Sequence, residues 1–286
     1  PTTQPDSRWP VNHEWTWQLN RHAAWLELAK AYYATGDEVY AAKLAEFVRD
    51  WIRSCPPPAD RADNRSGSKW RTIEAGIRTG SVWPEVWPRV LASKSFDDDT
   101  LLLWLASWVD HARYLMRFKT SGNWLTMEAN GLYHIGALFP EFREAAAWRA
   151  TAMERLMAEL DIQVYPDGAQ IELAPGYHAV SLINFLGPIE LASRTAFEVP
   201  ASYTAKLERM YDYLLASMQP TRRMPPFNDS AAGSVERYFE TAVRLFPARS
   251  DFRWLWSQGR EGAPPPTPLR FLPYAGQVFF RSGWEP

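Results

Sequence analysis

The sequence predicts an all-α protein, and three observations lead to this class. Apolar residues recur at helical spacing through most of the 286 residues. Residues typical of helix caps separate these segments, as at Gly36-Asp37 and at the three aspartates 97–99. The connections are mostly short, as between antiparallel neighbours in helical arrays. We therefore expect about ten helices in an α/α solenoid or toroid. A strict 34-residue repeat is absent, which argues against a tetratricopeptide-type array.

The first part of the chain is predicted to begin with a helical hairpin over residues 15–52. Gly36 suits the position after the first helix, and Asp37 suits the N-cap of the second. A loop is predicted at 56–69. The helices that follow are expected at 70–83 (before Pro84 and Pro88 disturb it), 95–118, 124–138, 141–162, 178–195, 202–217 and 232–246.

The stretch YPDGAQIELAPGYH, residues 165–178, interrupts this helical pattern. A Pro-Asp-Gly turn leads into an alternating run at 170–173 that is typical of a short strand. An Ala-Pro-Gly bend follows, and then Tyr177 and His178 stand side by side. We expect this rigid turn to present the Tyr177 hydroxyl.

The C-terminal tail departs from the helical pattern as well. A Pro-rich linker at 261–270 precedes the strand-like run Gln277–Phe280. A single strand has no sheet of its own, so we expect residues 274–284 to be an isolated extended segment, the first strand of a domain whose remainder is missing.

Composition limits the functional classes. The net charge of −2 argues against a broad nucleic-acid or membrane-binding surface, although a few local arginines suffice for an anionic ligand. No apolar run is long enough to span a membrane, and no signal peptide is found in the given residues, which begin like an internal or processed segment. The 15 tryptophans are expected to lie mostly in the core, with a few lining a groove where sugar rings stack.

Several familiar kinds of site are missing from the sequence. The five histidines show no metal-binding spacing, and neither a GxSxG elbow nor a Gly-rich phosphate loop occurs. The aspartates 97–99 are best explained as helix caps. Four carboxylates expected at helix ends or loops keep a glycoside hydrolase open as an alternative: Glu74, Asp167, Glu172 and Asp229.

A resemblance to a known family rests on five segments in a fixed order. These are LNRHAAWLELAKAYYATGDEVYAAKL (19–44), WRTIEAGIR (70–78), SGNW (121–124), DGAQIELAPGYH (167–178) and AGQVFFRSGW (275–284). Together they resemble the heparinase II/III family of polysaccharide lyases, whose build oligoalginate lyases share. The resemblance implies an incomplete α/α-toroid catalytic domain at 1–262, followed at 263–286 by a linker and the first strand of a truncated β-sandwich domain.

The resemblance also implies a reaction, namely β-elimination on a uronate-containing glycan such as a glycosaminoglycan or alginate. The family's asparagine falls on Asn123 and its catalytic tyrosine on Tyr177. We expect Asn123, as the N-cap of its helix, to neutralise the uronate carboxylate. Tyr177 would serve as general acid and, in a syn geometry, also as base. Trp124 stands where some relatives carry a histidine, and the family's second-domain histidine would lie beyond Pro286.

Other residues are expected to bind the substrate. Glu74 and Arg78 are predicted to form an ion pair at i,i+4, with Arg71 one turn earlier free to reach a sulfate or carboxylate. The other expected binding residues are Trp124 and His134 near Asn123, Gln170 and Glu172 on one face of the short run, and His178, Arg222 and Arg223, which would lower the pKa of Tyr177.

The remaining expectations concern cofactors, partners and location. The residues present require no cofactor, and a structural metal in the missing β-domain stays open. The expected partner is an anionic uronate-containing poly- or oligosaccharide, with neither nucleic acid nor a membrane span. The resemblance implies a bacterial periplasmic or secreted protein. A toroid glycoside hydrolase and a non-catalytic glycan-binding toroid remain as alternatives.

Overall fold

The computed structural model describes residues 13–62, 68–195 and 197–284. The N-terminal segment 1–10 and part of the predicted loop at 56–69 therefore lie outside the described residues. The described chain divides into two compact units, residues 1–156 and 157–286, and the division falls within one helix. No helix in the described part of the chain is long and apolar enough to cross a membrane.

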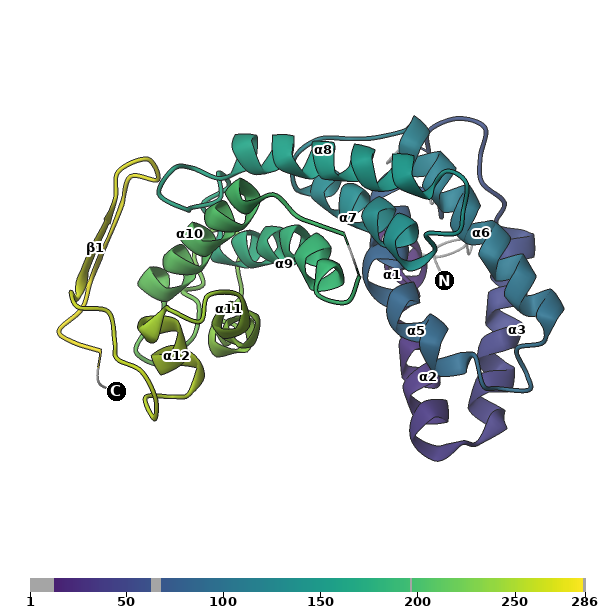
Figure 1. Cartoon of the computed structure of the whole chain (residues 1–286), viewed down its shortest axis with the longest axis horizontal. Helices are drawn as coiled ribbons and strands as arrows, with labels where there is room; N and C mark the ends of the chain where they lie inside the picture. Colours follow the sequence, from purple (N-terminus) through teal and green to yellow (C-terminus); the bar gives the residue numbers. More distant parts are fainter. Residues whose placement is uncertain (1–12, 63–67, 196, 285–286) are drawn as a thin grey trace, which may run out of the picture. The chain divides into compact units, whose positions relative to one another are not determined.

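The described residues confirm the all-α class, with a single hairpin at the C-terminal end (Figure 1). The helices are α1 (His13–Leu19), α2 (Ala23–Thr35), α3 (Glu38–Ser54), α4 (Thr72–Ile77), the π-helix η1 (Arg78–Val82), α5 (Trp83–Val90), α6 (Asp98–Arg117), α7 (Gly122–Leu138), α8 (Ala145–Gln163), α9 (Pro175–Ala192), α10 (Ala201–Ser217), the 3₁₀ helix η2 (Glu236–Tyr238), α11 (Phe239–Leu245) and α12 (Ser250–Trp256), and the strands are β1 (Leu269–Leu272) and β2 (Gln277–Phe280).

The predicted caps of the first unit are confirmed. Gly36 ends α2 in the left-handed conformation, with φ 70°, and its N–H bonds the Tyr32 carbonyl. The Asp37 side chain accepts from the Val39 N–H, and Asp97 accepts from the Thr100 N–H at the start of α6. Local sequence therefore determines where α3 and α6 begin.

The two prolines after residue 83 do not end the helix, contrary to expectation. Pro84 occupies the first turn of α5, where a missing N–H costs nothing, and Pro88 lies inside the same helix. The chain instead widens just before this point into the π-helix η1. Short π-helical turns within α-helices often occur near functional sites.

Helices α4 and α7 pack in unusually close contact, because glycines face each other across them. A Cβ atom on Gly131 would lie 2.5 Å from the Gly76 carbonyl oxygen, and one on Gly76 would lie 2.6 Å from the Met127 carbonyl oxygen. Only glycine allows this approach. It holds the helix that carries Asn123 against the helix that carries Glu74.

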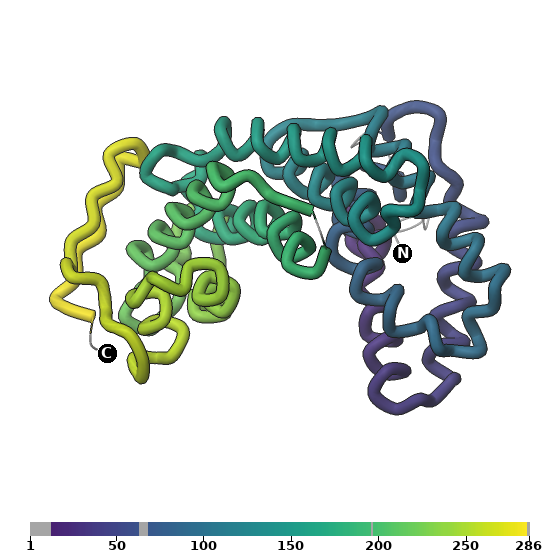
Figure 2. The backbone as a smooth tube through the Cα atoms, viewed as in Figure 1, coloured from purple at the N-terminus to yellow at the C-terminus, as the bar shows by residue number. Residues whose placement is uncertain are grey.

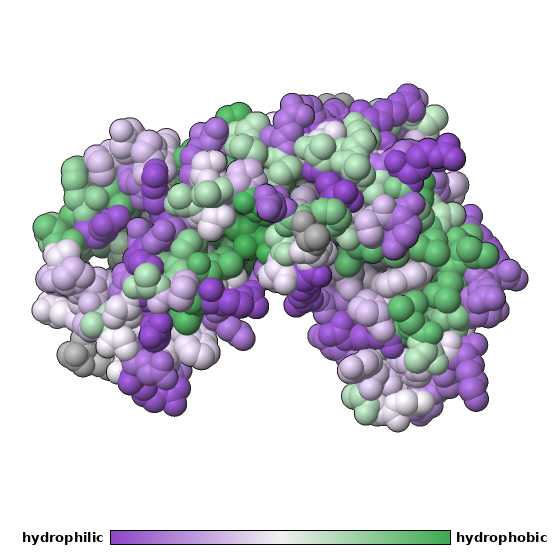
Figure 3. Space-filling model, viewed as in Figure 1, coloured by the Kyte–Doolittle hydropathy of each residue, from purple (hydrophilic) through white to green (hydrophobic). Residues whose placement is uncertain are grey.

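Tryptophans fill the core of the first unit, as expected for most of them. Buried indoles in edge-to-face and stacked contact form its centre: Trp25, Trp83, Trp104 and Trp108. By contrast, Trp15 is exposed. Hydrophilic and hydrophobic residues are interspersed on the face of the molecule that Figure 3 shows, as is usual for a protein surface.

The second unit packs α9 against α10, with α11 and α12 alongside, and it carries the hairpin, which is yellow in Figure 2. Strand β2 lies where it was predicted, but it is not isolated. It pairs antiparallel with β1, so that Leu269 faces Phe280 and Leu272 faces Gln277. Strand β1 occupies the end of the predicted linker and the residues just after it. The expectation of an unpaired segment was wrong, and the described residues form no larger sheet.

Contacts with the helices hold the hairpin in place. Leu272 and Ala275 are buried against Ala169 and Tyr213. The Asp167 carboxylate accepts from the N–H groups of Tyr274 and Ala275, at 2.8 and 3.0 Å. Asp167 is therefore a structural residue of the hairpin turn.

Two further predictions differ from the structure. The run at 170–173 is a turn with a single bridge between Val164 and Gln170, not a strand. The helix predicted at 232–246 is limited to η2 and α11, because Ser234 bridges to Arg223 ahead of them.

Candidate functional site

Tyr177 lies in the first turn of α9, one residue earlier than the predicted helix start. Pro175 is the first residue of this helix, a position for which its fixed φ is suited. The turn ahead of it requires left-handed backbone at Gly168 and Leu173, with φ 92° and 53°. A Cβ atom on Gly168 would collide with the backbone of Arg209, so this position requires glycine. The turn therefore packs tightly against α10 and presents Tyr177 half-exposed.

A second segment of the same unit contacts the Tyr177 turn. The Tyr177 hydroxyl donates to Asp229 Oδ2 at 3.1 Å, and the Gly176 N–H donates to Ser230 Oγ at 2.9 Å. The Asn228 side chain donates to the Leu173 carbonyl at 2.9 Å. From the sequence, Asp229 is expected as a glycosidase carboxylate or as part of a subsite wall formed by the loop 222–230, and its contact with Tyr177 is not predicted.

His178 cannot act on Tyr177 as a cation, contrary to expectation. It is buried, its Nε2 lies 3.0 Å from the Met210 carbonyl oxygen, and its ring packs on Tyr213. Burial lowers the pKa of His178 to about 4, so the ring is neutral at neutral pH. His178 therefore belongs to the core between α9 and α10.

Gln170 and Glu172, which were predicted to share one face, hydrogen-bond to each other within the turn. The Gln170 amide donates to Glu172 Oε1 at 3.0 Å, and Gln170 Oε1 accepts from the Glu172 N–H at 2.9 Å. Gln170 is buried and Glu172 is exposed. Gln170 therefore stabilises the turn, and the Glu172 side chain is at the surface.

Arg222 and Arg223 have their own partners. Arg222 forms an ion pair with Glu236 at 2.9 Å, and its guanidinium lies over Trp254. It lines a hollow of about 440 Å³ next to the last residues of the hairpin. Arg223 is exposed and donates to the Ala232 carbonyl. The charged group that contacts the Tyr177 hydroxyl is thus the Asp229 carboxylate.

Asn123 belongs to the first unit, in the first turn of α7. It is the second residue of the helix, and Ser121 occupies the N-cap position, so the prediction of Asn123 as N-cap was wrong. The Asn123 carbonyl accepts from Thr126 Oγ1 at 2.6 Å. Buried Glu128 holds the preceding residues by accepting from Thr120 N and Oγ1, at 2.9 and 2.7 Å. The amide side chain of Asn123 is half-buried at this helix N-terminus.

Arg71 forms the centre of a stack next to Asn123. Its guanidinium lies 3.4 Å from the centre of the Trp17 ring and 5.0 Å from the centre of the Trp124 ring. Both nitrogens of its fork donate to Glu74, at 2.7 and 2.8 Å, and Arg21 bonds the same carboxylate at 3.2 Å. Arg71 and Glu74 are buried, so they hold Trp124 in place and are not free cations or acids.

Sequence analysis missed Trp17 and Arg21, which complete this stack. Trp17 lies in the last turn of α1, and Arg21 follows the end of this helix, within the segment 19–44 that carried the family resemblance. The spacing alone places both side chains on one side of the chain. No local signal connects them to Glu74, which is 53 positions away from Arg21.

Arg78 does not pair with Glu74, so the predicted i,i+4 ion pair was wrong. Its guanidinium is fully buried and donates to the carbonyls of Asn20 and Lys69 at 2.9 and 2.8 Å. It also contacts His111 Nε2 at 3.2 and 3.1 Å. Burial lowers the pKa of Arg78 to about 9. Arg78 is therefore a core residue that joins four segments of the first unit, and substrate cannot reach it.

His134 is not near Asn123 either. It lies 11 residues later on α7, roughly 16 Å along the axis at 1.5 Å per residue. It is buried, its Nδ1 is 2.8 Å from the Asn130 carbonyl oxygen, and burial lowers its pKa to about 4. His134 is a neutral core histidine.

The carboxylates proposed for a hydrolase have other roles. Glu74 accepts from two arginines inside the first unit, and Asp167 holds the hairpin turn. In the part of the chain that the structure describes, no cluster of three or more histidine, cysteine, aspartate or glutamate side chains is placed to hold a metal ion.

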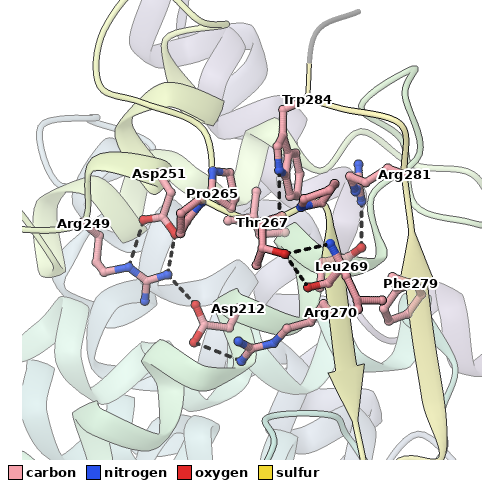
Figure 4. A pocket seen from close by; sticks show the side chains of 14 residues that line it. Asp212, Arg249, Asp251, Pro265, Thr267, Leu269, Arg270, Phe279, Arg281 and Trp284 are labelled. Atoms are coloured by element: carbon pink, nitrogen blue, oxygen red, sulfur yellow. Dashed lines mark hydrogen bonds and ion pairs between the residues drawn. The ribbon is translucent and has the colours of Figure 1, made fainter.

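The second unit also contains a cavity of about 270 Å³ between α10, the start of α12 and the hairpin (Figure 4). Arg249 is bound there by Asp212 and Asp251, and Arg270 lies 4.0 Å from Asp212. These two arginines are thus paired with carboxylates, whereas Arg281, which also lines the cavity, donates to the Ala216 and Met218 carbonyls. None of the predicted site residues lines this cavity.

Comparisons with known proteins give a consistent result. A family model described as the heparinase II/III N-terminus matches residues 4–254. A heparin-sulfate lyase from Pedobacter heparinus is 33% identical over 284 residues, which covers 97% of this chain and 43% of that protein. A solved heparan sulfate lyase from the same organism has 31% identity and a TM-score of 0.79, covering 100% of this chain and 45% of that chain.

A solved heparinase III has 29% identity and a TM-score of 0.81, covering 100% of this chain and 47% of its own length. The chain thus has the fold of the N-terminal part of these structures and spans less than half of the length of the relatives it matches.

Proposed function

Because the chain belongs to the heparinase II/III N-terminal family, we propose that it is part of a polysaccharide lyase. The proposed substrate is a uronic-acid-containing glycosaminoglycan, and heparan sulfate is the first choice because the relatives are named for it. Alginate and other uronate polymers are second choices. We also propose a bacterial periplasmic or secreted location, where such polymers would be met.

The proposed reaction is a β-elimination. The C5 proton of the uronate is removed, the C4–O4 bond breaks, and a double bond forms between C4 and C5. The uronate carboxylate opposes proton removal, because its negative charge disfavours the enolate-like transition state. A donor that takes up this charge and a group that moves the proton are therefore the two requirements.

The observation that carries the proposal is the placement of Tyr177. Its hydroxyl is half-exposed in the first turn of α9, on a turn whose backbone is fixed by Gly168 and Leu173 and bound by a second segment. A phenol hydroxyl at this place can transfer its proton to the leaving oxygen O4. In a syn geometry the ionised phenol would instead accept the C5 proton and then pass the same proton to O4.

Asn123 is the proposed partner of the uronate carboxylate. It lies in the first turn of a 17-residue helix, where the helix dipole favours an anion. Trp124, held over Arg71, offers an indole face beside it for a sugar ring.

The test measures unsaturated uronate by its near-ultraviolet absorbance, using the full-length protein and a panel of uronate polymers. We expect Tyr177→Phe to keep the fold and the oligosaccharide affinity but to lose at least about 10²-fold in turnover. Tyr274→Phe is the matched control, because this exposed tyrosine of the same unit lies in the hairpin turn. Near-wild-type turnover of Tyr177→Phe would refute the role of Tyr177.

The same assay separates the alternatives. A glycoside hydrolase would cleave the polymer without forming the absorbing product. A glycan-binding protein without catalysis would bind the polymer and leave it intact.

A further inference from the structure

The turn at residues 226–230 is hydrogen-bonded at three points to the segment 173–177, although more than 50 residues separate the two segments in sequence. Asn228 donates to the Leu173 carbonyl, Ser230 Oγ accepts from the Gly176 N–H, and Asp229, between them, accepts from the Tyr177 hydroxyl. Three consecutive side chains therefore point to one short segment of the site.

The backbone of this turn is shaped for that contact. Asn228 adopts φ 53°, the left-handed conformation that asparagine tolerates better than most residues. Leu173, whose carbonyl it binds, adopts the same φ of 53°. A bulky residue in this conformation is unusual and persists only where its surroundings hold it. The flanking bonds thus fix Asp229 on both sides.

We propose that Asp229 is a positioning residue for Tyr177, fixing its hydroxyl for proton transfer to or from the glycan. This inference rests on the proposed function. The phenol of a half-exposed tyrosine swings about two side-chain torsions, and a general acid or base acts only within about 2.6–3.2 Å of the reacting atom. An acceptor held at 3.1 Å from the hydroxyl restricts that swing before substrate binds.

The Asp229 carboxylate also fixes the direction in which the phenol hydroxyl points. The hydroxyl hydrogen points to Asp229 Oδ2, so the lone pairs of the phenol oxygen face away from Asp229. His178 is neutral and directed to the Met210 carbonyl, and Arg222 is paired with Glu236. The Asp229 contact therefore sets the direction of the hydroxyl.

The test is a double-mutant cycle in the full-length protein, with unsaturated uronate as the product measured. Asp229→Ala should lower kcat about 10- to 100-fold with KM within about twofold of wild type, because the ring stays but its aim is lost. Asp229→Asn, whose carbonyl still accepts the hydroxyl, should recover part of the loss. Glu240→Ala is the control, as it removes an exposed carboxylate from α11 of the same unit.

The cycle separates positioning from a structural role. If Asp229 acts through the hydroxyl, Asp229→Ala should cause no further loss in a Tyr177→Phe background. An equal loss in both backgrounds, or a loss that follows a large drop in Tm, would show a structural role and overturn the inference. Asp229→Asn keeps the test valid if the alanine variant fails to fold.

The outcomes also separate this inference from the proposed function. If Tyr177→Phe abolishes turnover while Asp229→Ala keeps kcat close to that of the wild type, the inference fails and the proposed function stands. If the wild type forms no unsaturated uronate, or if Tyr177→Phe has no effect, the proposed function fails and the inference falls with it.

Discussion

Within the described contacts of the stack, Glu74 is the one carboxylate that Arg71 and Arg21 share. Replacing Glu74 by glutamine removes this negative charge. Glu74 is fully buried, Arg71 is 5% exposed at its side chain, and Arg21 is 23% exposed. The glutamine side chain would keep the shape, but its amide N–H₂ would face guanidinium donors. Removing one partner of a buried pair costs about 3–5 kcal/mol, because the other charge is left buried without compensation. We expect a loss in this range for the free energy of unfolding of the first unit.

Glu46→Gln is the matched control. Lys43 and Glu46 form an ion pair of the same i,i+3 spacing on α3, at 2.8 Å, but both side chains are about half exposed. Breaking such a pair costs about 0.5 kcal/mol or less. The contrast between the two variants therefore measures burial and not spacing.

Urea unfolding followed by tryptophan fluorescence is the suitable assay. Twelve of the 15 tryptophans belong to residues 1–156, so the signal reports mainly on the first unit. A loss below about 1 kcal/mol for Glu74→Gln, or a loss equal to that of Glu46→Gln, would refute the reasoning that this pair is a buried structural element.

Three further outcomes are expected. Burial lowers the pKa of His178 to about 4, whereas its value in the unfolded chain is about 6.5. Between these pH values the unfolded state binds more protons, so the free energy of unfolding falls as the pH drops from 6.5 to 4. His178→Gln should remove up to ~3 kcal/mol of this decrease, measured by unfolding across the same pH range. Asp167→Ala should cost about 1–3 kcal/mol and speed hydrogen exchange at the N–H groups of Tyr274 and Ala275, and unchanged exchange would contradict its anchoring role. Gly76→Ala should lower Tm through a loss of about 1–3 kcal/mol or more, because its Cβ would lie 2.6 Å from a backbone oxygen of α7, and a stable variant would show that this helix pair separates easily.

The sequence predicts those features of the fold that neighbouring residues determine. Gly36, Asp37 and Asp97 end and begin helices through contacts within four residues, and each acts as predicted. The strand at Gln277–Phe280 is marked by its own β-forming residues. Its partner β1 was missed because it follows closely on a proline-rich run and is stabilised by pairing, which is not a local signal.

The site was less predictable, because burial and distant contacts decide it. Glu74 has a cation available at both i−3 and i+4, and the core takes Arg78 away to bind carbonyls and His111, which leaves Arg71 as the partner. His178 is adjacent to Tyr177, but a helix turns by about 100° per residue, and the His178 ring points into α10. Tertiary contacts decide which partner each of these side chains takes, and helical spacing alone does not predict it.

The contacts of Tyr177 determine at which stage of folding the region around it is completed. Its partners at 228–230 follow only after α9 and α10 in the chain, so the pairing closes a loop of more than 50 residues. Contacts of such separation form late in folding and open early under stress. A chain could thus keep its helices, its circular dichroism and its core while the 226–230 turn is detached. A low concentration of denaturant, or a protease that cuts this turn, should then abolish the activity that depends on Tyr177 before the second unit unfolds.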